Sequence, residues 1–84
     1  MRYFYITFRS VTYAQRGEQI LHRTGVYCTL QRTPRILQER GCSYCLRIRD
    51  RDISTAKAAL EQSGISYGKI YEINQGQPPR EVEL

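Results

Sequence analysis

Along the first residues of the chain, hydrophobic side chains alternate with side chains that are predicted to lie on the opposite, more polar side. Within 2–9 (RYFYITFR), Phe4, Ile6 and Phe8 fall on one side and Tyr3, Tyr5 and Thr7 on the other. Such alternation is typical of a strand with one buried face. It recurs in 26–31 (VYCTLQ) and 43–49 (SYCLRIR). The sequence therefore predicts three strands, and a fourth over 67–73 (YGKIYEI) whose register the pattern does not define.

Two further segments carry small and hydrophobic residues at helical spacing. The first follows Ser10, a residue type that caps helices, and ends before Gly25. The second follows Asp50 or Asp52 and ends before Gly64. The stripes consist of Ala14, Gly17, Leu21 and Thr24 in the first segment and of Ile53, Ala56, Leu60 and Ser63 in the second. Small residues in such a stripe predict helices that lie close on a sheet.

These elements follow the order β-α-β-β-α-β, and both halves contain Leu-x-x-x-Gly, at 21–25 and 60–64. Two right-handed β-α-β units in tandem predict an α+β, ferredoxin-like sandwich. We expect a four-stranded antiparallel sheet with both helices on one face and the other face open. The domain is expected to span 1–73, and the polar tail 74–84 (NQGQPPREVEL) to be flexible or to dock on a partner.

Length and composition narrow the class of protein. Eighty-four residues form one small domain with a modest core, too small for a deep cleft between lobes. No hydrophobic run approaches the roughly 18 residues of a membrane helix, and the N-terminus lacks the hydrophobic block of a signal peptide. We therefore expect a cytoplasmic protein that does not bind membranes. Three cysteines, an odd number, favour reduced thiols over a disulfide framework.

The formal net charge is +5, and of the 13 basic residues only Lys57 and Lys69 are lysines. Arginine offers a planar fork that suits phosphate, carboxylate or thiolate, and it stacks on rings. Many of the arginines lie between residues 32 and 51. They form either a surface for anions or nucleic acid, or a solvated face. Charge alone favours the solvated face.

Cys42 and Cys45 form a C-x-x-C pair, which can be redox-active or half of a zinc site. Zinc needs about four ligands, and the other candidates are Cys28, expected in the core, and His22. We therefore expect neither a metal nor another cofactor. Three residues of strand span about 10 Å, whereas a disulfide needs Cα atoms within roughly 7 Å. The pair can close only if Cys42 lies in a turn before the strand.

Cys42 is the better candidate for thiol chemistry. It lies at a junction between loop and strand beside Gly41, with Arg35, Arg40 and Arg47 close in the sequence. Nearby cations favour the thiolate, which is the nucleophilic form of cysteine.

The open sheet face is a second candidate site. There Tyr3 and Tyr5 are expected beside Arg47 and Arg49, and rings next to arginines are similar to a platform for single-stranded RNA. The RNA-recognition signature, however, fails in its second half at 40–44 (RGCSY). Packing against a second copy of the chain, as a homo-oligomer, is the alternative that we favour for this face.

Several motifs together resemble the selenium/sulfur carrier protein-like family of short bacterial and archaeal domains. The specific part is Thr33-Pro34-Arg35 followed by Cys42, with Leu46-Arg47 four and five residues later. The wider resemblance, over residues 3–73, includes 7–10 (TFRS), Ala14, Glu18, 32–35 (RTPR) and 41–47 (GCSYCLR).

The resemblance implies a carrier in which Cys42 accepts sulfur or selenium as a persulfide-type adduct. A donor protein would supply the atom and an acceptor protein would receive it. Arg35 and Arg47 would stabilise the anion. The sequence departs from the family at Ser43, where glycine is usual, and at Cys45, where alanine is common. The extra thiol of Cys45 would release or resolve the adduct.

Three classes of function are therefore open. The leading one is a thiol carrier or accessory domain for sulfur or selenium. The others are a nucleic-acid-binding module on the open face, and a protein-interaction or regulatory domain with inert cysteines. The chain contains no Ser/His/Asp pattern, phosphate-binding loop or dinucleotide-binding glycine motif, so we expect a carrier or binding domain and not an enzyme.

Overall fold

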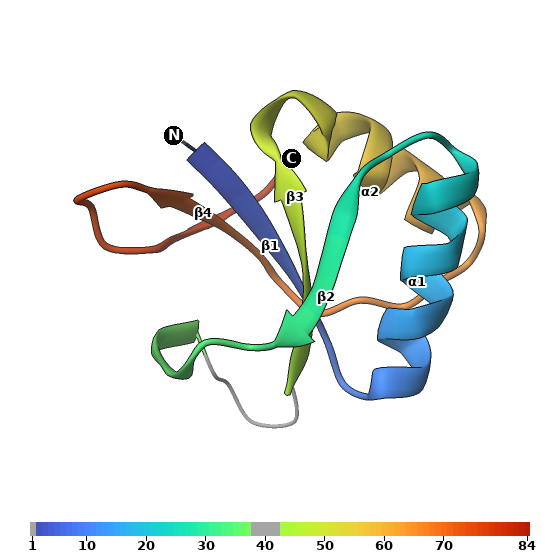
Figure 1. Cartoon of the computed structure of the whole chain (residues 1–84), viewed down its shortest axis with the longest axis horizontal. Coiled ribbons are helices and arrows are strands. Elements are labelled where there is room, and N and C mark those ends of the chain that lie inside the picture. Colours follow the sequence, from blue (N-terminus) through green and yellow to red (C-terminus); the bar gives the residue numbers. More distant parts are fainter. Residues whose placement is uncertain (1, 38–42) are drawn as a thin grey trace.

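The computed structural model in Figure 1 describes residues 2–37 and 43–84. The expected α+β class is confirmed, because two helices accompany an antiparallel sheet. The elements are β1 (Arg2–Phe8), α1 (Val11–Arg23), β2 (Cys28–Arg32), η1 (Arg35–Leu37), β3 (Tyr44–Arg49), η2 (Asp50–Asp52), α2 (Ile53–Gln62), β4 (Ile70–Asn74) and β5 (Arg80–Val82), where η denotes a 3-10 helix.

The strands lie in the order β2-β3-β1-β4-β5, and each is antiparallel to its neighbours. The middle strand, β1, pairs with β3 on one side and with β4 on the other. Ile6 of β1 faces Leu46 of β3 and Ile70 of β4. The register of β4, which the sequence left undefined, is thereby fixed.

The sheet has five strands, so the expectation of four was wrong. The additional strand lies in the polar tail, where Gly76 adopts a positive φ of 78° and the Gln77 N–H donates to the Asn74 carbonyl at 3.1 Å. This turn lays Arg80 opposite Glu72 of β4. Three residues with a single hydrophobic side chain, Val82, carry too little alternation to predict a strand.

The helix ends agree with the sequence signals. The Ser10 hydroxyl accepts a hydrogen bond from the Tyr13 N–H at 3.3 Å, as an N-cap does. Gly25, beyond the end of α1, has a positive φ of 85°. The second helix begins after a 3-10 turn, with Asp52 at its N-cap and no capping hydrogen bond from its side chain.

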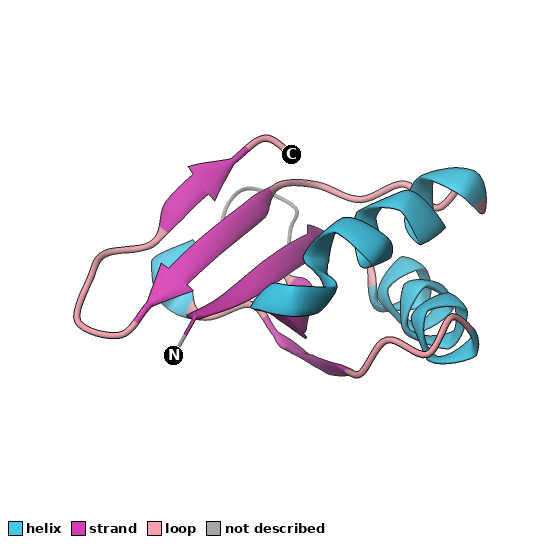
Figure 2. Cartoon of the chain, turned by 90° about the horizontal axis from the view of Figure 1, so that it is seen from above, coloured by secondary structure: helices cyan, strands magenta, loops and turns pink. Residues whose placement is uncertain are grey.

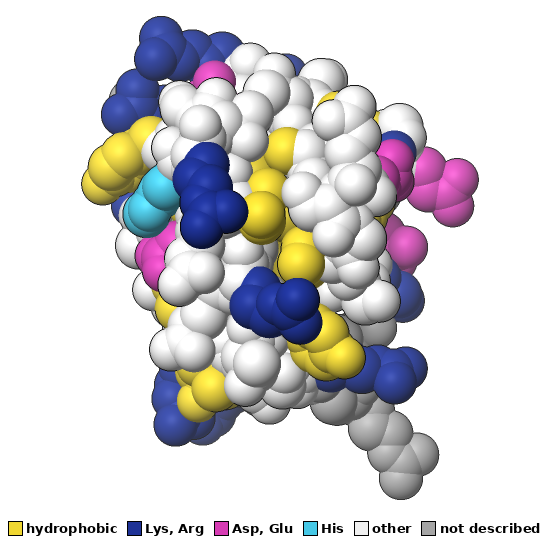
Figure 3. Space-filling view, turned by 90° about the vertical axis from the view of Figure 1, so that its right-hand side faces the viewer, with side chains coloured by type: hydrophobic (Ala, Val, Ile, Leu, Met, Phe, Trp, Pro, Cys, Tyr) yellow, Lys and Arg dark blue, Asp and Glu magenta, His cyan; other side chains and the backbone are white. Residues whose placement is uncertain are grey.

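Both helices share one hydrophobic core with one face of the sheet, and Figures 1 and 2 show them on the same side of it. Buried members of this core include Phe4, Ile6, Phe8, Ala14, Leu21, Leu46, Ile48, Ala56 and Leu60. Gly17 lets α1 lie close, because a Cβ there would be 3.2 Å from Phe8 Cζ. The outer surface of the helix layer is mainly polar, with scattered hydrophobic patches (Figure 3).

The opposite sheet face is only partly open. Thr7 and Cys45 lie on it by register, yet they are 1% and 0% exposed. On this side of the sheet the chain after β2 forms η1, whose Leu37 is buried while Ile36 is exposed (Figure 1). One end of the face is therefore covered, and the end that carries Tyr3 is the accessible one.

A buried carboxylate links the middle strand β1 to β4 and β5. Glu72 of β4 is 5% exposed. It accepts hydrogen bonds from Arg2 Nη1 at 2.8 Å and from Arg80 Nη2 at 2.6 Å. Arg2 also pairs with Asp50 of η2. The Glu72 network thus joins β1, β4 and β5 to η2, the 3-10 turn that precedes α2.

We predict that Glu72→Ala lowers the free energy of unfolding by about 2 kcal/mol, because charge-assisted hydrogen bonds to a buried group are lost. Urea denaturation provides the measurement. The matched control is Glu81→Ala, which removes an exposed pair with Lys69 (3.4 Å) and should change stability by less than about 1 kcal/mol. Equal effects of the two substitutions would contradict the structural role of the buried carboxylate.

Candidate functional site

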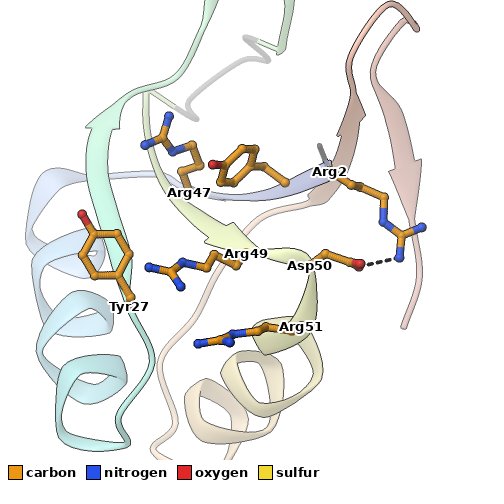
Figure 4. A pocket seen from close by; sticks show the side chains of 7 residues that line it. Arg2, Tyr27, Arg47, Arg49, Asp50 and Arg51 are labelled. Atoms are coloured by element: carbon orange, nitrogen blue, oxygen red, sulfur yellow. Dashed lines mark hydrogen bonds and ion pairs between the residues drawn. The ribbon is translucent and has the colours of Figure 1, made fainter.

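A cleft of about 680 Å³ opens at the accessible end of the sheet face opposite the helices (Figure 4). Its lining comprises four arginines (Arg2, Arg47, Arg49 and Arg51), two tyrosines (Tyr3 and Tyr27) and Asp50. We call it the arginine cleft. It is built where the end of β3 meets the start of β1, with Tyr27 immediately before β2.

Register and alternation explain how these side chains meet. Tyr3 lies directly opposite Arg49, and Tyr5 opposite Arg47. The guanidinium carbon of Arg47 lies 4.9 Å from the centre of the Tyr3 ring, and that of Arg49 lies 5.0 Å from the Tyr27 ring. These are cation–π distances, so each ring orients a guanidinium.

The cleft is strongly positive. Among the described residues, no carboxylate forms an ion pair with Arg47 or Arg49. Asp50 turns towards Arg2, whereas Arg49 and Arg51 extend towards the side on which Tyr27 lies (Figure 4). The contact of Arg51 with Asp52, at 3.9 Å, is long and the Arg51 side chain is 77% exposed. Such an arrangement can bind an anion.

Two of the three cysteines are buried free thiols. Cys28 lies in the main core, as the alternation predicted. Burial, and then the negative charge of Glu18, raises its pKa to about 11. Burial likewise raises the pKa of Cys45 to about 11, although a hydrogen bond with Thr33 acts in the opposite direction. Both groups are therefore protonated at neutral pH.

Cys42, the predicted adduct-bearing residue, lies outside the described residues. Cys45 sits in β3 between Thr7 and Gln31 of the neighbouring strands, with Sγ 4.0 Å from the Arg32 carbonyl. Cys45 has no exposed surface, so its thiol is not accessible to a partner protein in this structure. Its role as a releasing thiol stays a prediction.

The other predicted site residues separate into two groups. Tyr3, Tyr5, Arg47 and Arg49 come together on the accessible sheet face. Arg35, the second predicted anion-stabilising residue, is exposed in η1.

Sequence reasoning missed Tyr27, Arg51 and Arg2 as lining residues. Tyr27 had a signal, because the alternation that puts Cys28 in the core puts Tyr27 on the other side. Arg51 lies in a 3-10 turn, which has no strand or helix periodicity to predict its direction.

In the described part of the chain, no group of three or more His, Cys, Asp or Glu residues is placed to hold a metal ion. Nor does any described helix have the length and hydrophobicity to cross a membrane.

Fold and site together define a small α+β domain with a cationic cleft on one sheet face. Residues 3–72 match the family described as "Putative Se/S carrier protein-like", and the chain belongs to this family. The resemblance seen in the sequence is confirmed. No curated protein and no solved structure matches the chain.

We predict that native Cys28 and Cys45 resist alkylation. A pKa near 11 in place of 9.0 leaves about a hundredfold less thiolate at neutral pH, and burial restricts access further. Iodoacetamide labelling can be followed residue by residue with mass spectrometry. Both cysteines should react at least about a hundredfold more slowly in the folded protein than in urea. Rapid labelling of either cysteine in the folded protein would contradict this.

The same shifts predict that stability falls as pH rises above about 9. Between pH 9 and 11 the unfolded chain loses thiol protons that the folded chain retains, so unfolding is favoured. Below pH 9 both states keep these protons and the effect is absent. The urea midpoint measured from pH 7 to 10 should decline less steeply in a Cys28→Ala/Cys45→Ala variant. An unchanged slope would assign the decline to other groups.

Proposed function

We propose that this protein is a small carrier or accessory domain for sulfur or selenium, with Cys42 as the residue that bears the transferred atom. The family membership supports the class of cargo. The burial of Cys28 and Cys45, both with raised pKa, supports the choice of residue. If a thiolate acts at neutral pH, only Cys42 of the three cysteines is left for it.

The transfer step needs a donor that contains an activated chalcogen, such as a protein or low-molecular-weight persulfide. The Cys42 thiolate attacks the terminal sulfur of the donor persulfide. A new S–S bond forms at Cys42, the S–S bond of the donor breaks, and the donor leaves as a thiolate with the electron pair. The product is Cys42 persulfide, and no external oxidant or reductant is consumed. Selenium would take the same course from a donor with a terminal selenium.

Arg47 and Arg35 are the residues that we propose to stabilise the anionic adduct. Arg47 forms no ion pair with the described carboxylates, and Arg35 is exposed in η1. Both guanidiniums are therefore available to an anion. The positive charge would lower the thiol pKa of Cys42 and would bind the more acidic persulfide.

The donor and the acceptor would be proteins, and self-association through the open face is a further part of this proposal.

We also propose that β1 to β4 and the two helices form a ferredoxin-like core, to which β5 is added. The order β2-β3-β1-β4 supports this classification.

We predict that glutathione persulfide loads one sulfur atom on the wild-type protein and none on Cys42→Ser. Intact-mass measurement and peptide mapping give the site. Cys28→Ala and Cys45→Ala are the matched controls and should still load, because their thiols are buried. If Cys45 resolves the adduct, Cys45→Ala should also retain it longer in the presence of an acceptor thiol.

Equal loading of Cys42→Ser and wild type would exclude Cys42 as the carrier. If Arg47→Ala and Arg35→Ala load as much sulfur as the wild type, the two arginines do not have the proposed role. The proposal that Cys42 is the carrier residue would be retained.

A further inference from the structure

The arginine cleft is not used by the proposed thiol chemistry, apart from Arg47. It combines two chemical features in one place. Arg47 and Arg49, which form no ion pair with a described carboxylate, offer charge, and the exposed ring of Tyr27 offers flat hydrophobic surface. A ligand that fills it should therefore contain both an anion and a planar group.

The charge is arranged to receive separate anionic groups. Arg47 and Arg49 are two residues apart on β3, so their side chains leave the same face about 7 Å from one another. Arg51 comes next in η2 and also lines the cleft. Asp50, the acidic member of the lining, is engaged by Arg2. An extended ligand with repeated negative charges matches this row of cations.

The rings supply the second feature. Tyr27 is 60% exposed, although one face of its ring is occupied by Arg49. Tyrosine rings and stacked guanidinium planes are both surfaces on which nucleic-acid bases stack. The cleft volume of about 680 Å³ is within the range of small-ligand sites.

We propose that the arginine cleft binds nucleotide units, with phosphates on Arg47, Arg49 and Arg51 and a base against Tyr27. An acidic peptide would satisfy the guanidiniums but would offer no base to stack on the exposed ring of Tyr27, so nucleotides fit the cleft better. The shared chemistry is a phosphate next to a base, which either a free nucleotide or a single-stranded nucleic acid can supply. Nucleotide binding in the cleft does not require the thiol of Cys42, so the failure of the carrier proposal would not affect it.

The test uses the full-length protein and a fluorescein-labelled single-stranded RNA octamer, with binding measured by fluorescence anisotropy from 50 to 300 mM salt. AMP, ADP and inorganic phosphate serve as competitors. We expect the affinity for RNA to fall steeply with salt. If AMP or ADP competes at concentrations comparable to RNA, the ligand is a free nucleotide. If only RNA binds tightly, the ligand is a single-stranded nucleic acid.

Two double variants distinguish binding in the cleft from nonspecific attraction by the net positive charge. Arg47→Ala/Arg49→Ala should weaken binding by about tenfold or more, because charge-assisted contacts are lost. The salt slope should become less steep by about 0.7 for each phosphate contact removed. The control Arg16→Ala/Arg23→Ala removes the same charge from exposed positions on α1, and should change affinity less than about threefold.

The role of the ring is tested at Tyr27. Tyr27→Phe should bind like wild type, whereas Tyr27→Ala should lose several-fold in affinity, because base stacking is worth about 1 to 3 kcal/mol per base. The proposal is overturned if neither RNA nor nucleotides bind at 50 mM salt. It is also overturned if the α1 control loses as much affinity as the cleft variant, or if polyglutamate competes as well as RNA.

Discussion

The pairing of β1 with strands on both sides is the constraint on which the rest of the molecule depends. Because successive side chains of a strand point to opposite faces, its register decides both surfaces at once. Phe4 and Ile6 enter the core beneath the helices, and Tyr3 is thereby placed opposite Arg49 in the cleft. A slip by one residue would expose the core side chains and bury the cleft. The packing that stabilises the core therefore also maintains the cleft geometry.

The Glu72 network connects this sheet to the electrostatics of the cleft. A buried carboxylate is stable only when it is paired and hydrogen-bonded, and Arg2 is one of the two partners of Glu72. Arg2, at the start of the middle strand β1, is thus held in place, and it also engages Asp50. The carboxylate of Asp50 is drawn away from Arg49 and Arg51, as Figure 4 shows. The ion pairs of Arg2 therefore leave Arg47 and Arg49 of the cleft without a carboxylate partner among the described residues.

Features that depend on periodicity were predictable from the sequence, whereas features that depend on long-range contacts were not. Alternation assigned Tyr3, Tyr5, Arg47 and Arg49 to one face, and the structure brings them together. It also assigned Cys45 to that face, but alternation does not reveal what covers a face, and Cys45 is fully buried. The strand β5 was missed because it is held by Arg80 on Glu72 and by Val82 on the core, contacts that the sequence of a three-residue segment does not reveal.

The two proposals concern residues near opposite ends of one segment of the sequence, 42–51. In the sequence, Cys42 precedes β3 by two positions, while Arg49 is the last residue of that strand and lines the cleft. Six strand residues span about 20 Å, so a mononucleotide in the cleft would not extend along the whole of β3. A longer single-stranded nucleic acid or a protein partner could extend further, but only by passing the covered end of the face, where Thr7 and Cys45 are buried. If RNA binding and persulfide loading both hold, their mutual effect measures whether one partner uses the whole strand. Loading of Cys42 that changes when the cleft is occupied would join the two functions, and independent loading would separate them.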